Sequence, residues 1–164
     1  MLRRDYEGQV CSIARTLELV GDRWTLLIIR DVALGNHRFD ELLDSLGVAS
    51  NVLTDRLNRL VAEGVLDRVP YSQRPQRFEY HLTKKGRELG VALLALMQWG
   101  DKHLSEKPPR IARRRSDRSP VSVRVVAKDG SIVPPDDLEI VHGPGAPPTR
   151  QKQTRPPGEP VRPR

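Results

Sequence analysis

The sequence predicts a mainly helical α+β fold, and three observations lead to this prediction. Apolar residues recur at helical spacing through most of residues 12–103. Strict alternation of apolar and polar residues, which is typical of half-buried strands, is confined there to two short runs. The length of 164 residues fits one domain with appendages, and a hydrophobic content of 37% allows that domain a core of modest size.

The first two helices are expected on either side of Gly21. Residues 12–20 carry apolar side chains at i, i+4 and i+7, and Gly21 ends this segment. Asp22 is a good N-cap for a second helix over residues 23–34. The second segment is too apolar for a surface helix, so we expect it at the centre of the core.

A pair of amphipathic helices joined by a short turn follows. Residues 39–46 form the first of the pair, which ends at Gly47. Ser50 can cap the second, residues 51–63, whose leucines share one stripe and whose end is marked by Gly64. The connecting turn has the length found in helix-turn-helix motifs.

Two strands and a long helix come next. Residues 65–69 and 78–82 alternate between apolar and polar, which predicts a hairpin. Its long basic loop, residues 70–77, holds two prolines and two arginines. Thr83 caps a last helix that extends to about His103 and is apolar around more than half of its circumference.

The positive charge of the chain is concentrated after the predicted helices. Residues 1–107 carry 16 Lys and Arg against 15 Asp and Glu, whereas residues 108–164 carry 12 against 6 and hold 12 of the 14 prolines. We expect a basic linker and a small β-hairpin appendage over residues 108–146, with its turn at Asp129-Gly130. Residues 147–164 have the composition of a disordered tail.

The order of these elements is that of a winged helix-turn-helix, in which the second helix of the motif enters the major groove and the hairpin, or wing, grips the backbone or the minor groove. The ordinary alternative is a solvated helix face and a solvated loop. The expected DNA contacts of the recognition helix are Ser50, Asn51, Thr54, Asp55, Arg56, Asn58 and Arg59. The residues expected to contact DNA from the wing, or to contact the DNA phosphate backbone, are Arg23, Arg38, Arg74, Gln76 and Arg77.

Asp55 is unusual among these contacts because a carboxylate repels phosphate. It either accepts a hydrogen bond from a cytosine amine or orients Arg59, which lies one helical turn further on.

The first and last helices have apolar stripes too wide for a small domain to cover, and such patches are typical of interfaces. We therefore expect a homodimer, although both helices could instead pack on their own domain. The expected interface residues are Ile13, Leu17, Leu93, Leu96, Met97 and Trp99.

These residues resemble the HxlR-type winged helix regulators of bacteria. The resemblance is carried by residues 11–31, with a Gly-x-[Lys/Arg]-Trp-Thr signature at Gly21–Thr25, and by residues 38–42, 50–57 and 71–86. It covers roughly residues 10–104 without a gap. The resemblance implies a dimeric, sequence-specific DNA-binding transcriptional regulator, often a repressor, that dimerises through its first and last helices and binds operators with two half-sites.

The chain departs from the family pattern at two places. Ser12 stands where proline is common. Some members carry an appendage like residues 108–146 in which paired cysteines suggest a metal-bound ribbon. Those cysteines are missing here, so we expect no metal site in this segment.

Cys11 is the single cysteine, which excludes an intramolecular disulfide framework. It lies at a helix N-terminus with Arg15 one turn on, and both the helix dipole and the cation favour the reactive thiolate. Several members of the family carry a regulatory cysteine at this position, so Cys11 is a candidate sensor of oxidants or electrophiles. The alternative is an inert residue in the dimer interface.

An enzyme is the main class that the sequence argues against. The histidines, at positions 37, 81, 103 and 142, lack metal-ligand spacing, Cys11 has no histidine nearby, and no phosphate loop is present. We therefore expect no catalytic residue and no cofactor. The closest rival is a winged helix used for protein–protein contact, with nucleic-acid affinity from the basic tail alone.

The expected partners are double-stranded DNA, a second copy of the chain and a small-molecule or redox effector. No apolar run approaches the roughly 20 residues that a membrane helix needs, and the first residues lack the apolar region of a secretory signal. We therefore expect a cytoplasmic protein without a membrane partner.

Overall fold

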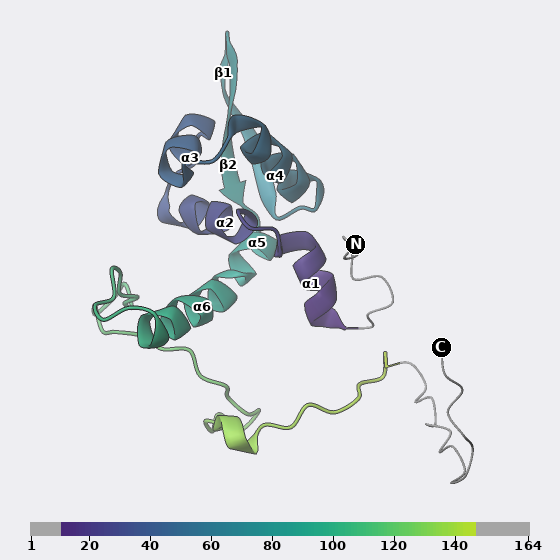
Figure 1. Ribbon diagram of the computed structural model, residues 1–164, viewed down its shortest axis with the longest axis vertical. Coiled ribbons are helices and arrows are strands. Elements are labelled where there is room, and N and C mark those ends of the chain that lie inside the picture. The colour runs from purple at the N-terminus through teal and green to yellow at the C-terminus, as the bar shows by residue number, and fades with distance from the viewer. Residues whose placement is uncertain (1–10, 147–164) are drawn as a thin grey trace, which may run out of the picture.

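The structure is a computed structural model that describes residues 11–146, and it is a mainly helical winged helix-turn-helix with a two-stranded wing (Figure 1). The predicted fold class is thus confirmed for its helical part and its wing. The helices are α1 (Ser12–Val20), α2 (Thr25–Leu34), α3 (Phe39–Leu46), α4 (Ser50–Ala62), α5 (Lys84–Glu88) and α6 (Gly90–His103). The strands are β1 (Leu66–Gln73) and β2 (Gln76–Leu82).

The core lies where α2, α3 and α4 meet the base of the hairpin. α2 contacts α3, β2 and α6, which confirms that it is the central helix. The leucines of α4 recur at i, i+4 and i+7, so that all of them face the core. The fully buried apolar side chains are Ile28, Ile29, Leu42, Leu53, Leu57, Leu60, Val65 and Leu66.

Two helices begin at residues other than the predicted ones. α2 starts at Thr25, whose backbone N–H donates to the carbonyl of Asp22 over 3.0 Å, so Asp22 belongs to a preceding turn and is not the N-cap. α4 has Ala49 as its N-cap, and Ser50 is its first helical residue. The expected end of α3 is confirmed, because Gly47 adopts the left-handed conformation with φ 60° that favours glycine.

The hairpin is longer than the sequence predicts. β1 and β2 pair in antiparallel register from Leu66 opposite Leu82 to Gln73 opposite Gln76, with one irregularity between Pro70 and Ser72. The expected loop at residues 70–77 is therefore mostly strand. Proline is tolerated here because both strands of a two-stranded sheet are edge strands. The wing consequently extends well beyond the helices (Figure 1).

The last helix is two helices and not one. Thr83 caps the first of them as expected, since its hydroxyl oxygen accepts a hydrogen bond from the N–H of Gly86 over 3.1 Å. Gly86 is buried, and a Cβ atom there would collide with the carbonyl oxygen of Val65. The chain turns at Leu89 between α5 and α6.

The segment after α6 is extended. The predicted hairpin amounts to an isolated bridge between Val126 and Ile132 around the Asp129-Gly130 turn, followed by a single 3-10 turn at Pro135–Asp137. The expected disordered tail, residues 147–164, lies outside the described residues. Among residues 11–146, no helix combines the length and apolar character needed to cross a membrane.

Candidate nucleic-acid interface

The polar side of α4 faces away from the core. Leu53 and Leu57 are completely buried on one side of this helix, which leaves the opposite side to the solvent. The hydroxyl of Thr54 donates to the carbonyl of Ser50 over 2.8 Å and so stays close to its own helix. The exposed residues on this helix include Ser50, Asn51, Thr54, Asp55 and Asn58, all of which the sequence assigned to DNA contact.

The two arginines of α4 are engaged within the subunit. The Nη1 atom of Arg56 lies 2.9 Å from Oδ2 of Asp22, and the Nη1 atom of Arg59 lies 3.3 Å from the same oxygen. Arg59 also donates to the backbone carbonyl of Glu18. Arg59 therefore pairs with Asp22 and not with Asp55, and both arginines brace α4 against the turn between α1 and α2.

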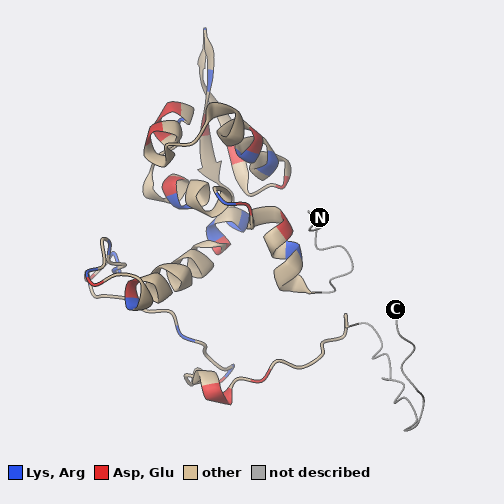
Figure 2. Cartoon of the chain, in the orientation of Figure 1, with Lys and Arg blue, Asp and Glu red and all other residues tan. Residues whose placement is uncertain are grey.

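The wing carries the second group of expected contacts. Arg74, Gln76 and Arg77 are all exposed at the outer end of the hairpin. The guanidinium of Arg68 lies 3.6 Å from the centroid of the Phe78 ring, a cation–π contact that stiffens the hairpin below its tip. Figure 2 shows that α4, beside the base of the wing, carries acidic and basic residues together.

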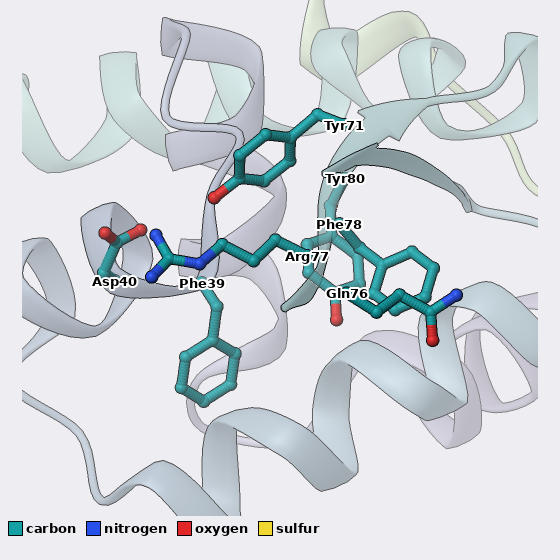
Figure 3. A pocket seen from close by; sticks show the side chains of 7 residues that line it. All are labelled: Phe39, Asp40, Tyr71, Gln76, Arg77, Phe78 and Tyr80. Carbon is teal, nitrogen blue, oxygen red and sulfur yellow. The ribbon is translucent and has the colours of Figure 1, made fainter. Parts of the chain in front are cut away.

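A cleft of about 400 Å³ separates the wing from the start of α3 (Figure 3). The side chain of Arg77 points across this cleft toward Asp40 (Figure 3). Aromatic rings from α3 and from both strands supply the apolar part of its wall. The lining residues are Phe39, Asp40, Tyr71, Gln76, Arg77, Phe78 and Tyr80.

Arg38 joins the start of α3 to the wing. Its Nε donates to Oε1 of Glu79 over 3.1 Å, and its guanidinium lies 4.6 Å from the centroid of the Tyr71 ring. The hydrogen bond from Arg38 holds the pKa of the Glu79 carboxyl below its ordinary value, with a further contribution from His81. The same hydrogen bond raises the pKa of Arg38. Arg38 keeps about half of its side-chain surface exposed, so it remains accessible to a phosphate.

Sequence reasoning missed Glu79 and Tyr71 as the partners of Arg38. The alternation along each strand predicts on which face of the hairpin Tyr71 and Glu79 lie. Their contact with Arg38 also depends on where α3 packs against the hairpin, and that position arises from tertiary packing. The backbone bridge between Arg38 and Glu79 shows how closely the two elements approach.

The side chain of Arg23 lies at the groove between α2 and α6. It stacks on the ring of its neighbour Trp24 at 5.0 Å and lines an apolar groove of about 960 Å³. The walls of this groove are formed by α2 and α6, with residues 110–112 along one side.

The residues expected in a dimer interface are largely uncovered. Ile13 and Leu17 of α1 are exposed, as are Leu96 and Trp99 of α6. Leu93 and Met97 are half-buried, and Leu93 packs on the core. Within the described chain, α6 has no buried residue at all.

Cys11 is exposed and is the N-cap residue of α1. Its backbone carbonyl accepts a hydrogen bond from the N–H of Arg15 over 3.1 Å. A cleft of about 710 Å³ lies beside it, and residues 140–146 form the other wall of this cleft.

Comparison with known proteins places this geometry in a family. The sequence profile of the HxlR-like helix-turn-helix family matches residues 19–108. The HTH-type transcriptional regulator Rv3095 of Mycobacterium tuberculosis is 50% identical over 110 residues, which are 66% of this chain and 68% of that protein. The family is one of transcriptional regulators and not of enzymes.

Solved structures of similar proteins share the fold. That of PA1607, a candidate transcription factor, aligns with a TM-score of 0.74 at 37% identity, over 83% of this chain and 97% of that one. This coverage extends beyond residue 107, so it includes part of the C-terminal segment. The redox regulator HypR in its oxidized form aligns with a TM-score of 0.53 at 31% identity, over 57% of this chain and 97% of that one. From the profile match and the shared winged fold, we conclude that this chain belongs to the HxlR-like helix-turn-helix family of transcriptional regulators.

Proposed function

We propose that this chain is a homodimeric repressor that recognises a specific DNA operator by placing α4 in the major groove. The observation that carries the proposal is the division of α4 into a completely buried leucine face and an exposed polar face. A major groove admits one α-helix, and short polar side chains on its outer face can reach the base edges.

The exposed side chains of α4 have distinct roles in this proposal. Asn51 and Asn58 carry amide groups that can bond two atoms of an adenine edge, and Thr54 can contact a thymine methyl group. Asp55, which has no ion-pair partner among the described residues, is available to accept from a cytosine amine. Arg56 and Arg59 are held by Asp22, so we assign them mainly the role of orienting α4. Contact with the DNA phosphate backbone is their secondary role.

The wing and the start of α3 supply the sequence-independent part of binding. Arg74 in the turn, and Gln76 and Arg77 at the start of β2, are exposed and can contact phosphates or enter a narrow minor groove. Arg38 is held by Glu79 in a fixed orientation and still exposes about half of its side chain, which suits a phosphate clamp. Arg23, next to the α2–α6 groove, is the weakest of the expected contacts.

Dimerisation through α1 and α6 is supported by the exposed apolar side chains of both helices. Ile13 and Trp99 are 67% and 58% exposed in the single subunit, and a second copy would remove this surface from water. A two-fold dimer places its two recognition helices on half-sites about 34 Å apart, or a multiple of that distance.

We further propose that the regulator responds to oxidants or electrophiles through Cys11. The support is the exposure of the thiol at a helix N-terminus and the presence of a redox regulator, HypR, among the similar structures. With a single cysteine in the chain, switching has to proceed through an adduct, a sulfenic acid or a Cys11–Cys11 bridge between subunits.

Competition binding tests the proposed DNA recognition. The purified full chain is titrated against duplexes from the regions upstream of candidate target genes, with random duplex as the competitor. We expect one of these duplexes to resist random competitor, and its affinity to fall as salt rises because bound cations are released. Equal affinity for every duplex would leave only the non-specific contribution of the basic residues and would refute sequence-specific regulation.

A further inference from the structure

The segment that follows α6 is extended and has no core of its own. Residues 108–146 are here named the C-terminal arm, and none of these described residues is buried. Its apolar side chains are unusually open to solvent, with Ile140 90% and Ile132 64% exposed. The other large apolar residues exposed on the arm are Ile111, Val125, Val126, Leu138 and Val141. An apolar, extended segment of this kind is typical of a surface that another chain covers.

The arm nevertheless follows a defined path along the subunit. The side-chain amide of Gln98 on α6 holds two points of it, because Nε2 donates to the carbonyl of Val121 over 2.8 Å and Oε1 accepts from the N–H of Val123 over 2.9 Å. Residues 110–112 lie along the groove between α2 and α6. The far end, residues 140–146, faces Cys11 at the start of α1. The arm thus leads from the end of α6 to the start of α1 (Figure 1).

We propose that the C-terminal arm is a clasp that closes around a second copy of this chain, with its apolar side chains packed on the partner subunit. The inference rests on the homodimer of the proposed function and extends it to a segment outside the winged helix.

Continuity with the exposed face of α6 favours a second copy as the occupant. Gln98 lies between Met97 and Trp99 on α6, so the residue that fixes the arm is adjacent to the residues expected in the dimer interface. A copy seated on α1 and α6 would lie in the space that the arm borders at both of its ends.

The charges of the arm also favour a second copy. Every Lys and Arg of the arm lies within residues 110–128, where Asp117 is the single acidic residue. Residues 129–146 contain four acidic residues and no Lys or Arg. Two arms related by a two-fold axis can lie side by side in opposite directions. The basic half of one arm can then face the acidic half of the other. Such a pattern is self-complementary.

The similar structures agree with a folded role for the arm. The match with PA1607 extends into this segment. This extension supports a fixed path for the arm.

Substitution of exposed arm residues tests the clasp in the full chain. Ile132→Asp and Ile140→Asp place a charge where the single subunit is open to water, so the subunit fold should not change. If these side chains are buried against a partner, the uncompensated charge should speed subunit exchange and raise the dissociation constant of the dimer by about tenfold or more. Gln98→Ala should act in the same direction. Sedimentation measures the dissociation constant of the dimer, and energy transfer between labelled subunits measures the rate of subunit exchange. Circular dichroism checks the fold.

A matched control distinguishes the arm from exposed apolar residues in general. Val69 is also a large exposed side chain, but it lies on the wing, so Val69→Asp should leave dimerisation unchanged. Hydrogen exchange adds a direct reading, since the amides of residues 121–141 should gain protection when the protein concentration rises through the dimer dissociation constant.

The outcomes separate the clasp from the proposed function. Arm variants that dimerise and exchange like the wild type would overturn the clasp and leave DNA recognition intact. A wild-type chain that stays monomeric, whether or not it binds DNA, would overturn both the dimer and the clasp. A dimer that is weakened by the arm substitutions but ignores all duplex DNA would uphold the clasp and refute the proposed regulator.

Discussion

The carboxylate of Asp22 lies 2.9 Å from the guanidinium of Arg56, and this ion pair fixes α4 to the turn between α1 and α2. The same carboxylate oxygen also contacts Arg59. One acidic residue thus restrains both arginines of the proposed recognition helix, and the orientation of α4 depends on a residue that touches no DNA in our proposal.

Replacing Asp22 should therefore change both stability and DNA affinity. We expect Asp22→Ala to lower the free energy of unfolding by only about 1 kcal/mol, because the ion pairs are partly exposed to solvent. The released arginines should strengthen binding to random duplex and so reduce the preference for the operator. Urea unfolding and competition binding measure the two effects. Unchanged discrimination between operator and random duplex would show that the brace does not control recognition.

Loss of an exposed polar side chain from α4 should weaken specific binding selectively. Asn58→Ala and Thr54→Ala should each reduce operator affinity by about tenfold to a hundredfold, with little change for random duplex. Glu88→Gln, an exposed position on α5, is the matched control and should bind like the wild type. Equal losses on operator and random DNA would indicate that these residues contact the backbone and not the bases.

The pair formed by Arg38 and Glu79 predicts a pH-dependent link between α3 and the wing. Because the folded state lowers the pKa of Glu79, the pair stabilises the protein above the ordinary value of 4.5 and this contribution is lost as pH falls through the lowered pKa. Glu79→Gln should therefore unfold at a lower urea concentration than the wild type at neutral pH. The difference should disappear in acid. A difference that persists at a pH well below the lowered pKa would contradict this assignment.

The exposed face of α6 should control assembly. Leu96→Asp introduces a charge at a position that is exposed in the single subunit, so the variant should fold normally and dimerise poorly. Its operator binding should then weaken because a monomer contacts one half-site alone. Sedimentation velocity, with Val69→Asp as the control, provides the measurement. A Leu96→Asp protein that remains dimeric would place the interface elsewhere.

Cys11 should be required for any response to oxidants. We expect diamide, which oxidises two thiols to a disulfide, to join two wild-type subunits through Cys11 and to alter operator affinity. Cys11→Ser should bind the operator like the untreated wild type and should ignore diamide. If the serine variant responds to diamide to the same extent, Cys11 is not the sensor.

The sequence was a reliable guide where a feature depends on local periodicity. The leucine stripe of α4, the turn at Gly47 and the cap at Thr83 all follow from residues close together in the chain, and each is present in the structure. The exposed polar face of α4 follows from the same stripe, since burial of one side of a helix determines the other.

Features that depend on contacts between distant segments could not be predicted in this way. Asp22 has the composition of an N-cap, but its carboxylate is drawn to arginines that lie more than 30 residues away in the chain. Pro70 is typical of a loop, yet it lies in β1, and a two-stranded hairpin accepts it because its outer edges are unpaired. The path of the C-terminal arm likewise depends on Gln98, a residue without any local signal.

Footprinting of the purified full chain on the intergenic DNA upstream of its own gene tests the central claim most directly. If a two-fold pair of α4 helices reads the major groove, two protected half-sites should appear with their centres about 34 Å apart, or a multiple of that distance. With Asn58→Ala, protection of both half-sites should require about tenfold to a hundredfold more protein. Absence of protection at low salt, on this and on every other duplex offered, would contradict the claim.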